Sequence, residues 1–155
     1  MKSVAEGIFG SVILYCLPLI GGCTKADLNS IQSLQNKAAQ IVTRSPPRAN
    51  RAWMYDKLDW LSVNQQIAYH TLLQVFRVRQ NKEPEYLYHC LGENSRNGRI
   101  FVPRANLTLM KESFTYRGIH LWNSIPSSMR GITKATSFKR EARKWTKEKI
   151  PRFTD

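Results

Sequence analysis

The stretch SVNQQIAYHTLLQVFRVRQ (residues 62–80) begins with a helix-start signal and continues with a long pattern of apolar residues. Ser62 and Gln65 have the spacing of a capping box, in which each side chain accepts a hydrogen bond from the other residue's backbone N–H. We expect His70, inside the pattern, to be packed and hydrogen-bonded rather than to act as a ligand. The apolar positions are dense enough to bury most of a helix: Val63, Ile67, Leu72, Leu73, Val75, Phe76 and Val78. The stretch therefore predicts the central core helix.

Two segments before this helix also predict helical structure. Residues 24–44 begin with capping-box spacing and then repeat apolar residues at steps of three and four, which predicts one buried face. The two prolines of SPPRANRA (45–52) forbid a continued helix, so we expect a loop that carries Arg48 and Arg51. Residues 53–61 predict a short helical turn. The predicted buried face of the first segment consists of Leu28, Ile31, Leu34, Ala38, Ile41 and Val42.

The apolar stretch VILYCLPLIGGC (12–23) allows two interpretations. As a signal peptide it has a basic start at Lys2, and LIGGC is similar to a lipoprotein cleavage site. Against this, Glu6 places an acid where the charge should be positive, and the apolar run is too short to span a bilayer. The alternative is a mostly buried helix that ends near Pro18 and Gly21–Gly22, because proline and paired glycines stop helices.

After the central helix, Pro84 predicts the start of one more short helix within 83–91. GENSRNGRIFVPRAN (92–106) contains two glycines and three asparagines, and it carries Arg96, Arg99 and Arg104. This composition is typical of an exposed, mobile loop. We therefore expect a basic loop between two helical parts.

The C-terminal part predicts two further helices. SFTYRGIHLWNSIPSSMR (113–130) indicates a helix followed by a turn at Pro126. In SFKREARKWTKEKIPR (137–152), Phe138, Ala142 and Trp145 form a narrow apolar stripe, and we expect Trp145 to pack rather than to stack on a base. The rest of this last helix is covered by cations: Lys139, Arg140, Arg143, Lys144, Lys147 and Lys149.

The whole pattern predicts an all-α fold, a small irregular helical bundle with a basic C-terminal helix. A chain of 155 residues is one domain by size, and we divide it into a helical core (1–91), the basic loop (92–106) and a basic helical extension (107–155). The formal net charge is +13, of which +4 lies in residues 1–91 and +9 in 92–155. Such an excess indicates a polyanionic partner, either nucleic acid or an acidic membrane surface.

Several kinds of chemistry are not indicated. The cysteines and histidines lack CxxC or HxxxH spacing, so we expect no zinc site. No phosphate-binding glycine loop and no GxSxG motif is present, and we expect no cofactor and no small-molecule substrate. For the block Tyr116-Arg117-Gly118 with Trp122 we expect core packing and a turn anchored by the arginine.

Five sequence blocks together carry a resemblance to a known family. They are SIQSLQNKAAQIVTR, MYDKLDWLSVNQQIAYHTLLQVFRV, EYL, SFTYRGIHLWNSIP and SFKREARKW, in this order. The chain resembles, over nearly its whole length, the thumb and post-palm region of LINE-type (non-LTR) retrotransposon reverse transcriptases. In that family an apolar helix with a Gly-rich turn precedes the LQNKAA helix. The resemblance therefore favours the buried-helix interpretation of residues 12–23.

The resemblance implies a fragment of an RNA-directed DNA polymerase that lacks its catalytic part. Polymerases hold two metal ions on paired aspartates, and the family carries these in a Tyr/Phe-x-Asp-Asp motif. Here the aspartates are Asp27, Asp56, Asp59 and Asp155, none adjacent to another, and we expect surface or capping roles for Asp56 and Asp59. We therefore expect no metal site and no enzymatic activity from this chain alone.

What the resemblance implies instead is a module that holds the RNA template or the RNA–DNA hybrid. Such contacts would be made to phosphates, independent of sequence and sensitive to salt. The partners would be RNA or an RNA–DNA hybrid and the palm domain of a reverse transcriptase, inside the cell, in the cytoplasm or nucleus. The candidate phosphate contacts are Lys139, Arg140, Arg143, Lys144 and Lys147, with a second group of Lys37, Arg44, Arg48 and Arg51.

Two alternatives remain open at this point. The chain could be a non-functional remnant open reading frame from a truncated element. It could also be a membrane-attached basic lipoprotein, which requires export or acylation of the N-terminal segment. Because of this requirement, we expect a membrane partner less than a nucleic acid partner.

Overall fold

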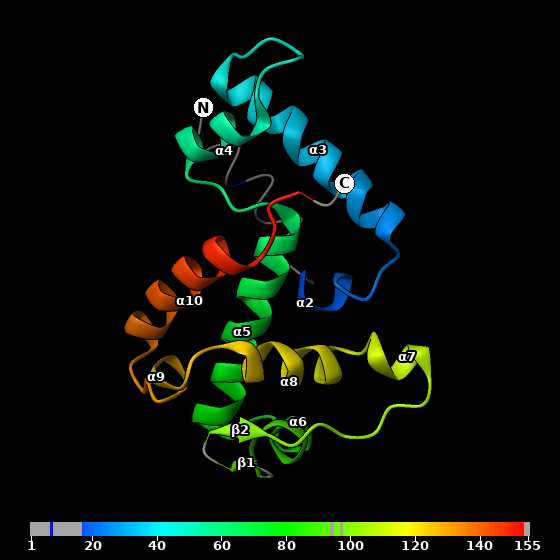
Figure 1. The fold of residues 1–155 in the computed structure, drawn as a ribbon, viewed down its shortest axis with the longest axis vertical. Helices are drawn as coiled ribbons and strands as arrows, with labels where there is room; N and C mark the ends of the chain where they lie inside the picture. The colour runs from blue at the N-terminus through cyan, green and yellow to red at the C-terminus, as the bar shows by residue number, and fades with distance from the viewer. Residues whose placement is uncertain (1–6, 8–16, 94, 97, 154–155) are drawn as a thin grey trace.

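The protein is all-α apart from one very short strand pair, as the sequence predicts (Figure 1). The computed structural model describes residues 7, 17–93, 95–96 and 98–153. The expected apolar helix before residue 17 lies outside these residues. The elements in chain order are α2 (Leu17–Ile20), α3 (Lys25–Thr43), α4 (Arg51–Leu58), α5 (Val63–Asn81), α6 (Glu85–Tyr88), the π-helical turn η1 (His89–Glu93), β1 (Ser95–Arg96), β2 (Arg99–Ile100), α7 (Thr108–Lys111), α8 (Phe114–Ser124), α9 (Ser127–Arg130) and α10 (Ala135–Lys149).

Helix α5 is the central core helix that the sequence predicts, and α2, α3, α8 and α10 all contact it. In Figure 1, α3 and α4 lie at one end of α5, and α6 with the strands lies at the other. Both bonds of the predicted capping box form: Gln65 N donates to Ser62 Oγ (3.4 Å), and Ser62 N donates to Gln65 Oε1 (3.2 Å). Gln65 also donates to Ile150 O at 3.1 Å, so the start of α5 holds the end of the last helix.

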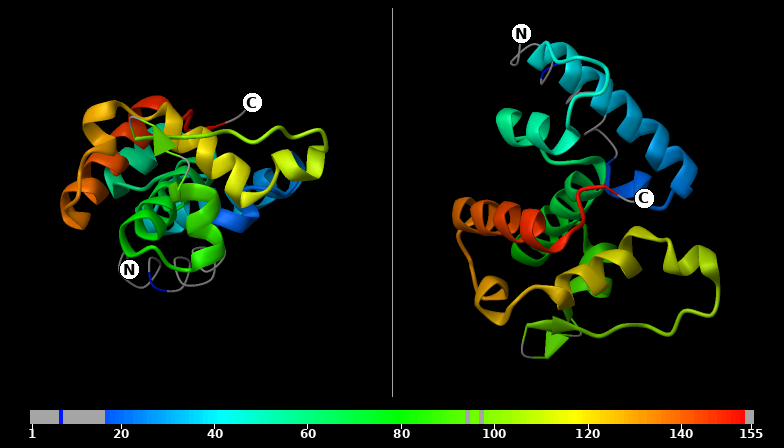
Figure 2. Two further views of the ribbon diagram at one scale, coloured as in Figure 1. Left: turned by 90° about the horizontal axis from the view of Figure 1, so that it is seen from below. Right: turned by 45° about the horizontal axis from the view of Figure 1, so that its top comes forward.

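The main hydrophobic core is built around an aromatic stack. The Phe138 side chain of α10 is fully buried, and its ring centroid lies 4.2 Å from that of Phe76 and 5.8 Å from that of Trp122. Leu91 and Ile100 belong to the same core. Side chains from 1–91, 92–106 and 107–155 thus share one core, in which α8 and α10 pack on α5 (Figure 2).

Helix α8 approaches α5 closely because residue 118 is a glycine. A Cβ built on Gly118 would lie 3.1 Å from Cγ2 of Val75 and 3.7 Å from Cγ2 of Thr71. The first distance is shorter than ordinary van der Waals contact, so a larger side chain would push the two helices apart.

We therefore expect Gly118→Val to lower the free energy of unfolding by about 1–3 kcal/mol through overpacking. Gly131→Ala is the matched control, because a Cβ there meets nothing closer than 3.8 Å. Urea unfolding of both variants measures the difference. Equal stability of the two variants would contradict the close packing of α8 on α5.

The stretch around the two glycines is a short helix fixed by an arginine. Leu17 is fully buried, and α2 ends at Ile20, directly before the paired glycines that were expected to stop it. Arg117 of α8 donates to Pro18 O at 2.8 Å and to Glu112 O at 2.9 Å. A Cβ on Gly21 would lie 1.9 Å from a guanidinium nitrogen of Arg117, so only glycine leaves room for this anchor.

The buried face of α3 agrees with the predicted one in part: Leu28, Ile31 and Val42 are partly buried and pack against core clusters. Leu34 is 54% exposed and Ile41 71% exposed, whereas Gln35 and Ala39 are buried. Gln35 is paired, since its Nε2 donates to Leu61 O at 2.9 Å. A buried amide is tolerated when it is paired. Gln35 thus meets the connection between α4 and α5, whereas Leu34 and Ile41 are exposed.

The 92–106 segment is more structured than the exposed loop that its composition predicts. Strands β1 and β2 pair antiparallel, with Ser95 opposite Ile100, and Gly98 adopts a positive φ of 72°. Ile100 is only 3% exposed, and Asn123 of α8 exchanges two hydrogen bonds with its backbone, at 2.9 and 2.7 Å. The Asn123 side chain thus satisfies the backbone N–H and C=O of Ile100 in β2.

Candidate nucleic-acid interface

The last helix has one buried face and one cationic face, as its sequence predicts. Phe138, Ala142 and Thr146 of α10 are fully buried, and Trp145 is half-buried against the main core. Thr146 pairs its hydroxyl with Ala142 O at 2.6 Å, which satisfies the one polar group on this face. Trp145 therefore packs, as expected.

Two of the five cations predicted on α10 are engaged inside the protein. Arg143 donates to Asp59 O at 2.6 Å and to Asp59 Oδ2 at 3.1 Å, and Lys147 forms an ion pair with the other carboxylate oxygen of Asp59. Asp59 is the C-cap residue of α4 and has a positive φ of 56°. The hydrogen bond from Lys147 holds the pKa of the Asp59 carboxyl below its usual range. These two cations thus attach α10 to α4.

A second pair of the same kind lies just beyond α10. Arg152 donates to Asp56 Oδ1 at 2.8 Å and to Ala52 O at 3.3 Å. Asp56 and Asp59 therefore have surface and capping roles, as expected, and both receive cations from the C-terminal segment. The sequence could not indicate these pairs, because the partners are 84 to 96 residues apart.

The other three of these five predicted cations remain open to a ligand, and we call Lys139, Arg140 and Lys144 the outer basic edge. All three are exposed. Arg140 lies 3.3 Å from Glu141 Oε1, but its side chain is 79% exposed, and such surface pairs contribute little. Within the described part of the chain, Lys139 and Lys144 form no ion pair.

The second predicted group lies on the α3–α4 end of the molecule. Lys37, Arg44 and Arg48 are exposed, and Arg44 is the C-cap of α3 with a positive φ of 54°. Arg51 was expected in the loop but is the first residue of α4, because Asn50 caps this helix by accepting bonds from Ala52 N and Trp53 N. Arg51 also lines a pocket.

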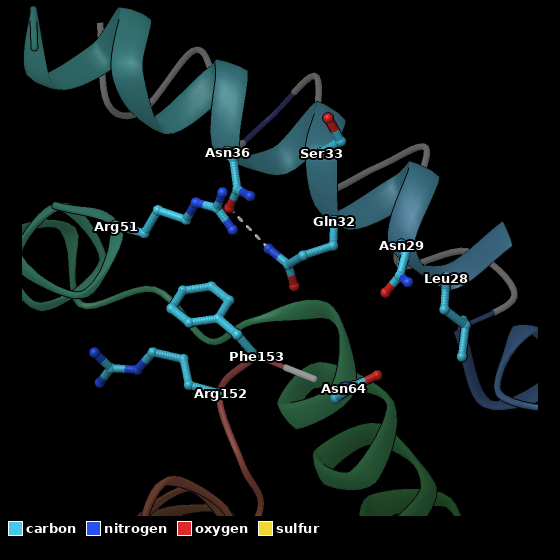
Figure 3. Close-up of a pocket in the computed structure, with 9 residues that line it drawn as sticks. All are labelled: Leu28, Asn29, Gln32, Ser33, Asn36, Arg51, Asn64, Arg152 and Phe153. Carbon is cyan, nitrogen blue, oxygen red and sulfur yellow. Dashed lines mark hydrogen bonds between the residues drawn. The ribbon is translucent and has the colours of Figure 1, made fainter. Parts of the chain in front are cut away.

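That pocket, of about 290 Å³, lies between α3, the starts of α4 and α5, and the C-terminal segment (Figure 3). Its wall is a hydrogen-bonded amide network. Gln32 donates to Tyr55 Oη at 2.6 Å and to Asn36 Oδ1 at 3.0 Å, and accepts from Val63 N at 2.9 Å. Burial raises the pKa of the Tyr55 hydroxyl well above its usual range. Side chains from four segments form this site, which is why sequence reasoning missed it.

The described residues contain no metal-binding cluster of three or more His, Cys, Asp or Glu side chains. Cys23 and Cys90 are exposed free thiols, while Cys16 and Asp155 lie outside the described residues. His70 is half-buried, with its ring centroid 5.2 Å from that of Tyr69. The expected packing of His70 is present, but no hydrogen bond to its ring forms within the described part of the chain.

His70 gives a testable pH dependence. Burial, and then the charge of Arg77, lower the pKa of its imidazole below the ordinary 6.5. As the pH falls through this ordinary value, the unfolded chain takes up the proton first, so the folded state loses stability. We expect His70→Gln to flatten the fall in the free energy of unfolding between about pH 7 and 5. Urea unfolding at several pH values measures this, and parallel curves for the two proteins would contradict it.

The Tyr116-Arg117-Gly118 block with Trp122 has the packing role that was expected. Trp122 is 2% exposed and donates its Nε1–H to Gly98 O at 2.9 Å. Arg117 anchors the turn at α2, and Gly118 sets the approach to α5, as described above. The ring of Tyr116 lies 4.5 Å from that of His120.

Comparison with known proteins gave no match to a family model, to a curated protein or to a solved structure. Within the residues that the structure describes, no helix combines the length and apolar character needed to cross a bilayer.

Proposed function

We propose that this chain holds RNA or an RNA–DNA hybrid through sequence-independent phosphate contacts, as a thumb-like module beside a separate reverse transcriptase palm. The observation that carries the proposal is the outer basic edge. Lys139, Arg140 and Lys144 are exposed on a helix whose opposite face is fixed in the core by Phe138 and Ala142. The backbone of this helix is already fixed, so its cations can neutralise phosphates without prior folding of the segment.

The ion pairs to Asp59 divide the basic helix into two parts. Arg143 and Lys147 have side chains that are 39% and 34% exposed and already share one carboxylate. They contribute to the positive field, but their first role is to hold α10 on α4. The outer basic edge therefore supplies the direct phosphate contacts, and the net charge of +13 supplies the longer-range attraction.

A protein partner such as a palm domain has support from a different region. Phe101 is 70%, Leu107 70% and Leu109 84% exposed, all on the connection to α7 or on α7 itself. Several exposed apolar side chains on one short segment are typical of a protein interaction site. The proposal therefore places nucleic acid on α10 and the protein partner near α7.

The test is fluorescence anisotropy of a labelled RNA–DNA hybrid with the purified chain over a salt series. We expect binding that weakens steeply with salt and does not depend on the hybrid's sequence. The variant K139E/R140E/K144E should reduce the slope of log K against log salt by about 2 to 3, since each neutralised phosphate contributes about 0.9. Circular dichroism verifies that the variant is folded.

The matched control is R99E/R104E/K111E, which changes the net charge equally at exposed positions away from α10. It should retain most of the slope. Equal losses in the two variants would show that net charge alone attracts the hybrid. A folded parent chain that ignores the hybrid at low salt would overturn the proposal and favour a remnant open reading frame.

A further inference from the structure

A small polar pocket of about 220 Å³ borders the main core at Phe76 and Trp122, and no residue of the outer basic edge lines it. Arg79 and Gln80 reach it from α5, Tyr88 from α6, Trp122 from α8 and Arg130 from α9. Among the residues whose side chains the structure describes, no Asp or Glu lines it. Two arginines that share a pocket without a carboxylate form an unusually concentrated positive charge.

Arg130 in this pocket has buried N–H donors without acceptors among the described residues. Its Nε and one terminal nitrogen, Nη1, are shielded from solvent, and neither has a hydrogen-bond partner within the described part of the chain. A guanidinium stays charged in proteins, and burying charged donors without an acceptor is costly. Buried polar groups are normally paired, so these two N–H groups call for an acceptor from outside the chain.

Contacts with the main core hold the second arginine, Arg79, in the same pocket. One of its terminal nitrogens donates to Leu91 O at 2.7 Å, and its guanidinium carbon lies 5.2 Å from the Trp122 ring centroid. The Trp122 ring is in turn fixed by its bond to Gly98 O. A guanidinium has five N–H donors, and the one hydrogen bond that Arg79 forms among the described residues, to Leu91 O, leaves others for a ligand. Desolvation also lowers the pKa of Arg79, as expected for a cation short of anionic partners.

The donors fit one phosphate group better than a carboxylate. One guanidinium fork saturates a carboxylate through two parallel bonds, whereas two forks from different helices can reach three oxygens. The Gln80 amide and the Tyr88 hydroxyl add neutral donors. The pocket is smaller than the ~300–1,000 Å³ of sites for drug-sized ligands, so it suits a single oxyanion group and not a whole nucleotide.

We propose that Arg79 and Arg130 form a phosphate-binding pocket, separate from the outer basic edge, that takes one phosphate group. The group is either free phosphate or the terminal phosphate of a nucleic acid strand, which present the same chemistry. The proposal does not depend on hybrid binding by α10.

The first experiment titrates the full chain with inorganic phosphate by calorimetry at constant ionic strength. Arg130→Gln is the test variant, because it removes the charge without disturbing Arg79, whose contacts to Leu91 and Trp122 support the core. We expect Arg130→Gln to weaken phosphate binding at least tenfold. Arg104→Gln, at an exposed position elsewhere, should bind as the parent does. In phosphate-free buffer the Arg130→Gln protein should be at least as stable as the parent, since it no longer buries an unpaired charge.

Two oligonucleotides of one sequence, with a 5′-phosphate or a 5′-hydroxyl, then identify the source. If the 5′-phosphate oligonucleotide binds more tightly and Arg130→Gln loses this difference, the ligand is a strand terminus. If the two oligonucleotides bind equally and the chain still binds inorganic phosphate, the ligand is free phosphate. Equal affinity for acetate and phosphate, or equal phosphate affinity of parent and Arg130→Gln, overturns the proposal. K139E/R140E/K144E should keep phosphate binding, and Arg130→Gln should keep the salt slope for the hybrid, so the two proposals fail separately.

Discussion

Phe138→Ala is expected to lower the free energy of unfolding by about 3–5 kcal/mol, the usual cost of removing a fully buried phenylalanine. The ring lies between Phe76 and Trp122 and joins α10 to both α5 and α8. Removing it leaves a cavity whose walls belong to three helices, so partial collapse cannot refill the space. A domain of this size has only about 5–15 kcal/mol of stability in total, so the loss would be a large part of it.

Urea unfolding, followed by circular dichroism, measures this effect. Glu148→Ala is the control on the same helix, because Glu148 is exposed, and it should change the free energy of unfolding by less than about 0.5 kcal/mol. A loss below about 1.5 kcal/mol for Phe138→Ala would mean that α10 does not depend on this aromatic stack.

The second large effect is expected for Arg117→Met, which should cost about 2–3 kcal/mol. The arginine donates to Pro18 O, 99 residues away along the chain, and to Glu112 O. Hydrogen bonds from a charged donor are worth more than neutral ones, and methionine leaves both carbonyls without this partner. Desolvation of Arg117 already lowers the pKa of its guanidinium, so part of the gain from its bonds is offset by burial.

Hydrogen exchange separates this role from a general loss of stability. In Arg117→Met, amides of residues 17–22 should lose protection more than those of α5, because the arginine fixes α2 in particular. Arg104→Met is the control at an exposed position and should leave both regions unchanged. Uniform loss across the chain would contradict the assignment of Arg117 as the anchor of α2.

The charges of the basic helix illustrate why residue type alone does not assign a role. Arg143 and Lys147 resemble Lys139 and Lys144 in the sequence, yet only the first two have Asp59 beside them. Reversing all five cations at once would therefore mix loss of phosphate contacts with repulsion from Asp59. The three-residue variant of the outer basic edge avoids this, since its members form no bond to α4 among the described residues.

The sequence by itself determined the features that depend on neighbours along the chain. The start of α5 follows from the Ser62–Gln65 spacing, the end of α2 from paired glycines, and the buried face of α10 from Phe138 and Ala142. These patterns are local, because a helix cap or an apolar stripe involves residues three or four positions apart. The all-α class follows from the same signals.

The tertiary structure alone decided which groups from distant segments meet. The inward face of α3 is predicted only in part, because a paired amide, Gln35, can be buried as well as an apolar residue. Asp59 pairs with α10, and Arg79 and Arg130 line one pocket, although no periodicity connects these residues. Hydrogen bonds and ion pairs of this kind depend on positions in space, and those are fixed only when the helices pack around α5.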